Sequence, residues 1–373
     1  MKKLFFLSLF ISLLSASYLT NKSCSECHEN IYEEYQTSYH SKTYFNDELH
    51  RKVANQASSE DNYDCSTCHM PSAMDQKMFA SGVKKPDQTK QRQKDAISCF
   101  YCHQIAYVKK AHLKNKIILT RQVEGYKPTI YGSLNNPQDS DKHTMTHSPI
   151  YDKYACSGCH SHKRNKHDVL IFDAMGDKQD SKGCIKCHMP LVDGKIEKMD
   201  KMSRLKHHDH SFAGIHDETM RQKGLDIKIT VQKKSLHVEL QNKTPHPLII
   251  QVARVKYLVL KIKRGGKIIW KNYKKSPLED KQGTFEINFL GKDGKPVIIP
   301  AFAYKRGFVN NIKAKESKIL KYNTPDLKKG DIIIASMYVI LAKPSCWKLL
   351  NLEDSRLKKP MLLKSISYTI KGN

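Results

Sequence analysis

Five copies of the segment Cys-x-x-Cys-His constrain what this chain can fold into. They begin at Cys24, Cys65, Cys99, Cys156 and Cys184, and they use ten of the eleven cysteines. In such a segment the two thiols can form thioether bonds to the vinyl groups of a haem, and the histidine that follows can bind its iron. A fold that holds five of these groups must be built around them.

Structural zinc and disulfides are the alternatives for paired cysteines, because Cys-x-x-Cys recurs in zinc ribbons and fingers. Neither requires a histidine directly after each second cysteine, and all five pairs have one. The motifs therefore predict a multihaem c-type cytochrome with five covalently attached haem c groups. The predicted attachment residues are Cys24, Cys27, Cys65, Cys68, Cys99, Cys102, Cys156, Cys159, Cys184 and Cys187, and the predicted proximal iron ligands are His28, His69, His103, His160 and His188.

The N-terminus has the pattern of a secretory signal peptide. Lys2 and Lys3 precede an apolar run over residues 4–14, and the small residues Ser15, Ala16 and Ser17 follow it. A membrane-spanning helix needs about 20 apolar residues, and this run is shorter. We therefore expect residues 1–17 to be removed by cleavage near Tyr18 and the mature protein to be periplasmic. An uncleaved membrane anchor is the alternative.

The motifs divide the chain unevenly. All of them lie between Cys24 and His188, which leaves about 33 residues for each haem, too few for a separate side-chain core around each one. We expect a loop-rich haem domain over residues 18–222, with short helices close to the motifs. Residues 82–95 and 125–149 contain many loop-forming residues and are predicted to be loops.

Residues beyond Gly224 change in pattern. Apolar and polar residues alternate over 225–232 and 236–241, as in half-buried strands. Gly265-Gly266 separates two further runs and predicts a hairpin turn. The remaining predicted strands are 255–262, 267–270, 285–289, 297–299, 332–341 and 365–370. This spacing predicts an antiparallel β-sandwich over residues 223–373 and an α+β protein as a whole. The sandwich is expected to brace the haem domain or to present a docking surface.

The sequence does not by itself identify the sixth ligand of each haem iron. Five of the eighteen histidines are proximal by motif, and five six-coordinate haems would need five more, since histidine is the usual second ligand. The thirteen that remain are His40, His50, His112, His143, His147, His162, His167, His207, His208, His210, His216, His237 and His246. Residue type alone does not choose among them.

Several segments resemble multihaem cytochromes related to the nitrifier tetrahaem cytochrome and hydroxylamine oxidoreductase group. The first motif continues to Tyr35-Gln-Thr-Ser-Tyr-His40, the third is preceded by Ala96-Ile-Ser, and the second and fifth end in Cys-His-Met-Pro. His210-Ser-Phe-Ala-Gly214 is similar to a segment that follows the last haem in that group. The resemblance implies that His40, His147 and His210 are distal ligands, with His143 fitting less well than His147.

Weaker candidates come from the same resemblance and from position. Asn242-Lys-Thr-Pro-His246 is similar to a ligand-bearing passage at the start of the β domain, but Pro245 replaces a glycine, so a role for His246 is left open. His167 is a further weak candidate, and His207 and His208 compete with His210. Met70 and Met189 adjoin their own proximal histidines, so we expect them to pack against porphyrin and not to bind iron.

Two functions from different classes remain. One is an electron carrier in which a row of mostly bis-histidine haems connects respiratory redox partners. The other is an oxidoreductase with one open-coordination haem that acts on hydroxylamine, nitrite or tetrathionate; whether the protein is an enzyme is left open. No Cys-x-x-Cys-Lys segment is present, which argues against a lysine-ligated catalytic haem. The surplus of histidines favours the carrier.

Net charge points to the partners. The formal charge is +27, and loss of Lys2 and Lys3 would leave +25, while the haem propionates would contribute on the order of −5. A cationic protein favours acidic redox partners or anionic surfaces, although the lysines can also serve solubility. We expect the partners to be other redox proteins, such as a membrane quinol dehydrogenase or a terminal reductase. Nucleic-acid binding is not expected of an exported haem protein, and no transmembrane segment is expected after cleavage.

Cys346 is the one cysteine outside the motifs. In Pro344-Ser-Cys-Trp347, next to a predicted strand, we expect it to be buried and to have no part in haem attachment. Replacement Cys346→Ser should leave the haem content unchanged, as measured by mass spectrometry of the purified protein. Loss of a haem from this variant would contradict the expectation.

Overall fold

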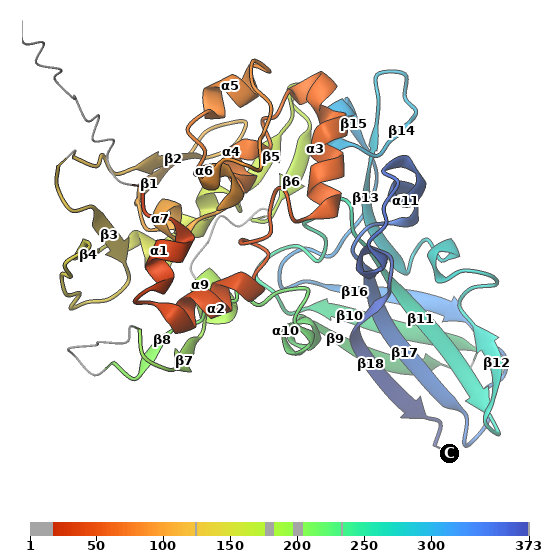
Figure 1. Ribbon diagram of the computed structural model, residues 1–373. Helices are drawn as coiled ribbons and strands as arrows, with labels where there is room; N and C mark the ends of the chain where they lie inside the picture. Colours follow the sequence, from red (N-terminus) through yellow and green to blue (C-terminus); the bar gives the residue numbers. More distant parts are fainter. Residues whose placement is uncertain (1–17, 124, 176–182, 197–203, 233, 372–373) are drawn as a thin grey trace, which may run out of the picture.

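The computed structural model describes residues 18–123, 125–175, 183–196, 204–232 and 234–371 (Figure 1). The predicted signal peptide, residues 1–17, lies outside this range. Among the helices of the described residues, none has the length and apolar character needed to cross a membrane. Short helices and loops make up the N-terminal half, and long antiparallel strands make up the C-terminal half, which confirms the predicted mixed fold.

The N-terminal part has mostly one- or two-turn helices. They are α1 (Asn21–Ser25), α2 (Glu29–Thr37), α3 (Glu48–Asp61), α4 (Ser66–His69), α5 (Gln76–Ala80), α6 (Gln91–Lys94), α7 (Cys99–Cys102), α8 (Ile150–Lys153), the 3₁₀ turn η1 (Ala155–Gly158) and α9 (Cys184–His188). Each Cys-x-x-Cys-His segment overlaps one of these short elements, as expected. Helix α3 differs from the prediction, because its 14 residues contain no motif.

Four small two-stranded sheets connect these helices. They pair β1 (Ile105–Lys109) with β2 (Lys116–Leu119), β3 (Thr129–Gly132) with β4 (Thr144–His147), β5 (His162–Arg164) with β6 (Leu170–Asp173), and β7 (Leu191–Asp193) with β8 (Lys206–His208). The β3–β4 pair is parallel and lies within residues 125–149, which were predicted to be a loop. Helix α6 likewise lies within 82–95. Pairing of this kind satisfies backbone groups that burial removes from water.

The C-terminal part begins after α10 (Glu218–Lys223) and consists of two antiparallel sheets. The smaller sheet has the order β16 (Ser317–Asn323), β10 (Ser235–Asn242), β9 (Leu225–Gln232). The larger sheet has the order β14 (Pro296–Val297), β13 (Thr284–Leu290), β11 (Val255–Arg264), β17 (Ile332–Ile340), β18 (Met361–Thr369), with β12 (Lys267–Lys271) beside β11 and β15 (Lys305–Asn310) beside β13. Further short elements are η2 (Pro277–Glu279), η3 (Pro300–Phe302), α11 (Pro344–Leu349) and η4 (Ser355–Leu357).

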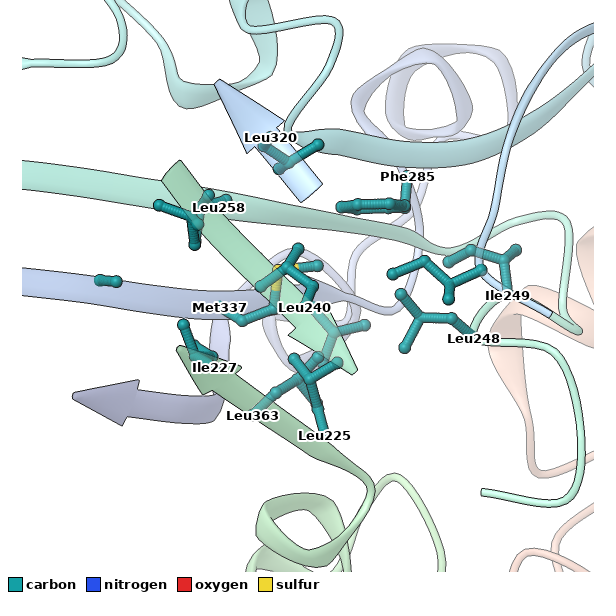
Figure 2. Close-up of a cluster of buried hydrophobic side chains, with 14 of the residues drawn as sticks. Leu225, Ile227, Leu240, Leu248, Ile249, Leu258, Phe285, Leu320, Met337 and Leu363 are labelled. Carbon is teal, nitrogen blue, oxygen red and sulfur yellow. The ribbon is translucent and has the colours of Figure 1, made fainter. Parts of the chain in front are cut away.

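One apolar core lies between the two sheets (Figure 2). Leu236, Val238 and Leu240 alternate along β10 and are fully buried, which is the period-two pattern of the sequence. Leu258 and Phe285 reach the same core from the larger sheet. Burial of these apolar side chains removes them from water and so stabilises the C-terminal part of the fold.

Most of the predicted strands are present, with some differences. Gly265 and Gly266 form the β11–β12 turn with φ of 54° and 80°, a left-handed conformation that glycine adopts without strain. The predicted strand 297–299 is reduced to β14. Strands β15 and β16 were not predicted: β15 is largely exposed, and in β16 the two buried residues, Leu320 and Tyr322, are separated by Lys321. The boundary between residues 222 and 223 stays a prediction.

Helix α3 joins the two halves of the chain. Its Ala57 packs in an apolar cluster with Ile299, Leu341 and Cys346, so Cys346 is buried as expected. The Glu48 carboxylate at the start of α3 accepts hydrogen bonds from the backbone N–H groups of residues 353 and 354, at 2.9 and 2.8 Å. The sandwich therefore packs directly against the motif-bearing part.

Truncation of the sandwich core should destabilise the fold. Leu258 is fully buried between the sheets, so Leu258→Ala should lower the free energy of unfolding by about 2–5 kcal/mol. Chemical denaturation followed by circular dichroism measures the change. Ile268→Ala is the control, because Ile268 is 49% exposed and should shift stability by about 0.5 kcal/mol or less. Equal losses in the two variants would contradict the assignment of the core.

Candidate haem-binding site

A local hydrogen bond shapes each Cys-x-x-Cys-His segment. The backbone N–H of His28 donates to the carbonyl oxygen of Cys24 at 2.9 Å, and the same bond recurs from His103 to Cys99 at 3.0 Å. It also recurs in the second and fourth segments, while in the fifth the same five residues form α9. One helical turn places the first cysteine and the histidine on the same face. Each segment thus presents its thiols and its imidazole together.

Capping residues start two of these turns. The Thr20 hydroxyl accepts from the Ser23 backbone N–H at the start of α1, and the Ser98 hydroxyl accepts from the Tyr101 backbone N–H at the start of α7. Asn21 then joins the two turns, because its side-chain oxygen accepts from the Cys99 backbone N–H at 2.9 Å. These bonds satisfy N–H groups that a short helix leaves unpaired.

Three motif histidines each face a second histidine from a distant part of the chain. The ring centroids are 6.2 Å apart for His28 and His143, 6.3 Å for His103 and His210, and 5.9 Å for His160 and His40. Two imidazoles that bind one metal ion from opposite sides have centroids about 6 Å apart, because each metal–nitrogen bond is about 2 Å long. The three pairs therefore fit a bis-histidine iron.

The fifth motif histidine, His188, lies near His246 of the C-terminal part. The two rings interact electrostatically, and burial lowers the pKa of His246 to about 4. The Nδ1 of His246 lies 3.0 Å from the carbonyl oxygen of Pro247 and 3.2 Å from the hydroxyl of Thr244. The β domain thus brings an imidazole to the fifth motif, and Pro245 does not prevent this approach.

The second motif is different. His69 faces His50, but their ring centroids are only 4.0 Å apart and tilted by 46°, which is too close for a metal ion between the rings. His50 lies on α3, and its Nδ1 is held by a 2.8 Å hydrogen bond to the Asp47 carboxylate. His50 is one of the thirteen histidines outside the motifs, and no feature of the sequence selects it. The only local signal is that Asp47, three residues earlier, is the N-cap of the same helix.

Hydrogen bonds from ring Nδ1 to backbone carbonyl oxygens orient four of the histidine rings described above. A carbonyl oxygen can only accept, so a ring whose Nδ1 faces one carries its proton there and leaves Nε2 free to bind metal. This arrangement holds for His28 with Ile196 (2.9 Å), His103 with Tyr131 (2.6 Å), His188 with Ala213 (2.6 Å) and His210 with His208 (2.6 Å).

Burial keeps the imidazoles neutral. It lowers the pKa of His40 to about 3, with a smaller effect from His160 and His188, and it lowers the pKa of His210 to about 3, with a smaller effect from His103. The pKa values of His103 and His160 are lowered for the same reason. Only the neutral ring can donate its lone pair to a metal. These histidines are therefore in the ligand-competent form at neutral pH.

Other candidates from the sequence lie elsewhere. His147 is the last residue of β4, and its buried Nδ1 makes no hydrogen bond within the described residues, but it is His143 whose ring faces His28. The Nε2 of His167 lies 2.9 Å from the Glu60 carboxylate, and its ring stacks on Tyr304. His207 uses both nitrogens, with Gly194 and Glu34. The structure thus favours His143 over His147 and engages the His167 ring in a hydrogen bond with Glu60.

Met70 also has a defined place. It is fully buried and packs with Tyr44, Ala54, Ala73 and Phe79. Its packing against porphyrin stays a prediction.

The motifs contact one another through their cysteines. The thiol of Cys24 interacts with that of Cys99, Cys68 with Cys159, and Cys156 with Cys184. Cys102 of the third motif acts electrostatically on Cys156 and Cys159 of the fourth. The contacts therefore run from the first motif to the third, fourth and fifth, with the second motif beside the fourth.

Comparisons with known proteins agree with this site. Residues 23–104 match the family described as cytochrome c554 and c-prime. This match spans the first three motifs and, together with the five motifs of the sequence, supports a multihaem c-type cytochrome. Each motif brings two thiols and an imidazole together on one helical turn, and these residues would hold a covalently bound haem c. The likeness to the hydroxylamine oxidoreductase group stays a prediction.

The overall fold resembles a solved structure. A penta-haem cytochrome c552 from Thermochromatium tepidum is similar over 94% of this chain and 99% of its own, with a TM-score of 0.71 and 21% identity. A structural genomics target and an oxidised superoxide reductase match 39% and 31% of the chain, with TM-scores of 0.18 and 0.16 and identities of 8% and 10%. No curated protein matches the sequence.

The histidine pairing makes a sharp prediction for the first motif. His143→Ala should remove a strong axial ligand, so one ferric haem should change from low spin to high spin in the electron paramagnetic resonance spectrum. His147→Ala is the matched control and should leave every haem low spin. A high-spin signal in His147→Ala, with none in His143→Ala, would reverse the assignment. Mass spectrometry checks that both variants carry the wild-type number of haems.

Proposed function

We propose that this protein is an exported five-haem electron carrier that connects respiratory redox partners. The observation that carries the proposal is the pairing of motif histidines with second histidines at the spacing of a bis-histidine iron. A closed iron leaves no position for a substrate, so such a site suits electron transfer better than catalysis. The count of five haems follows from five motifs, and the penta-haem cytochrome of similar fold supports it.

The residues of the chain have defined tasks in this function. When bound, haem supplies a reversible one-electron change at iron. The cysteines would anchor each haem covalently, and the paired neutral imidazoles would bind its iron. The hydrogen bonds at Nδ1 of His28, His103, His188 and His210 keep these four rings in a fixed orientation, which limits the rearrangement that accompanies a change in charge. The direct contacts between motifs keep neighbouring groups close.

Charge supports the choice of partner. With a formal net charge of +27 before any processing or haem attachment, the protein would attract acidic surfaces and accelerate their encounter. We infer that the partners are acidic redox proteins, such as a membrane quinol dehydrogenase on one side and a terminal reductase on the other. Export to the periplasm is inferred from the N-terminal pattern of residues 1–17.

The second motif favours an alternative function. The 4.0 Å spacing of His50 and His69 differs from that of the other ring pairs and leaves no room for iron between them. If His50 does not bind iron, the haem of the second motif keeps an open position. The protein would then act as an oxidoreductase on a small nitrogen or sulfur compound such as hydroxylamine, nitrite or tetrathionate.

Electron paramagnetic resonance of the oxidised protein, with haem content quantified by mass, separates the two functions. The carrier predicts five covalent haems and only low-spin ferric signals. One high-spin signal that shifts when nitrite or hydroxylamine is added, and that is unchanged in His50→Ala, would support the oxidoreductase and overturn the carrier. Fewer than five haems by mass would contradict both descriptions.

A further inference from the structure

A carboxylate on helix α2 holds two residues of a distant segment. Glu34 lies in α2, which begins directly after His28 of the first motif, and strand β8 passes beside this helix (Figure 1). One oxygen of the Glu34 carboxylate accepts from the ring Nε2 of His207 at 2.8 Å, and the other accepts from the backbone N–H of His210 at 2.9 Å. These two partners are 173 and 176 positions away in the chain.

His207 is held at both edges of its ring. Its side chain is 4% exposed, and its Nδ1 lies 3.1 Å from the carbonyl oxygen of Gly194. Gly194 has a φ of 136°, and a Cβ atom on it would lie only 3.1 Å from Cε1 of His207, so a glycine is needed for this close approach. Both ring nitrogens of His207 thus face oxygen acceptors. The ring is not free to bind iron and instead holds the Glu34 carboxylate in place.

His210 is the residue that this carboxylate fixes toward the third motif. The His210 ring faces that of His103, with centroids 6.3 Å apart and planes 25° apart. Its Nδ1 lies 2.6 Å from the carbonyl oxygen of His208, and the Phe212 ring packs edge-on against it. Because Glu34 binds the backbone N–H of His210 itself, the carboxylate determines where the side chain of that residue starts and which way it points.

We propose that Glu34 is a positioning residue for the haem attached at Cys99 and Cys102, where it holds His210 in the orientation that binds iron opposite His103. Groups that orient a ligating histidine typically change metal affinity by about 10–100-fold when they are removed. The inference rests on the proposed function, since it requires His210 as an iron ligand.

The same helix fixes the first motif relative to the third. Tyr35, the residue after Glu34, donates its hydroxyl to the carbonyl oxygen of Ile97 at 3.1 Å. Asn21 donates from its amide to that hydroxyl at 3.1 Å and accepts from the Cys99 backbone N–H at 2.9 Å. Two adjacent residues of α2 therefore bind the two sides of the third motif, one toward its attachment cysteines and one toward its opposite histidine.

Cyanide titration of the oxidised, haem-loaded protein tests the role of Glu34. Glu34→Gln leaves one acceptor oxygen in place of two, so the side chain cannot serve both His207 and the His210 backbone N–H. Cyanide must displace an axial histidine to bind, and a less firmly held His210 is displaced more easily. The variant should therefore raise the cyanide binding constant of one haem by about tenfold. One low-spin signal in the electron paramagnetic resonance spectrum should also shift, because that signal depends on the angle between the two imidazole planes.

Glu33→Gln is the matched control. Glu33 is the preceding residue of α2 and is exposed, so its replacement removes the same charge without touching the contact to His210. It should leave cyanide binding and the low-spin signals unchanged. Equal changes in Glu33→Gln and Glu34→Gln, or none in either, would overturn the positioning role and leave the carrier function standing. Circular dichroism and haem content by mass establish that both variants are folded and loaded.

A double-mutant cycle shows whether Glu34 acts through His210. His210→Ala removes the ligand, so adding Glu34→Gln to it should have no further effect on cyanide binding. The full tenfold effect of Glu34→Gln in the His210→Ala background would overturn the inference. If His210→Ala leaves every haem low spin, His210 is not an iron ligand, which would contradict the histidine pairing of the proposed carrier as well.

A structure of the haem-loaded wild-type protein gives a measurement that does not depend on any variant. A Glu34 oxygen within about 3.2 Å of the His210 backbone nitrogen, with His210 bound to the iron of the third motif, would support the role. Iron-bound His210 without this contact would overturn it.

Discussion

The pairing of imidazoles across the chain is the interaction on which the rest of this structure depends. Each motif supplies one imidazole within a single helical turn, but the imidazole opposite comes from a different segment, as with His103 and His210. Such pairs connect loops, short helices and small sheets that have few apolar contacts of their own. Metal ligation of this kind contributes directly to folding energy, because the site does not exist in the unfolded chain.

Two kinds of core therefore lie side by side in one protein. The sandwich has an ordinary side-chain core, with residues such as Leu240 and Phe285 buried between its sheets (Figure 2). In the described residues of the N-terminal part, a small apolar cluster surrounds Phe79 and Met70. Helix α3 connects the two, since Ala57 packs on the β domain while His50 faces the second motif. The sandwich thus packs directly against the part of the chain that carries the motifs.

The β domain also contributes functional groups. His246 brings an imidazole to the fifth motif. The sequence suggested two general roles for this domain, bracing and docking. The packing against α3 agrees with the first, and His246 adds a more specific one.

The sequence by itself determined the attachment residues, the proximal histidines and the alternating strands, because these depend on neighbours within a few residues. The one-turn geometry from Cys24 to His28 is local, and so is the burial pattern of β10. Only the tertiary structure decided that His143 and not His147 faces His28, and that His50 lies beside His69. The two histidines of a pair are brought together by packing between segments that are distant in the sequence. A local pattern of residues therefore does not predict which of several nearby histidines will face a motif histidine.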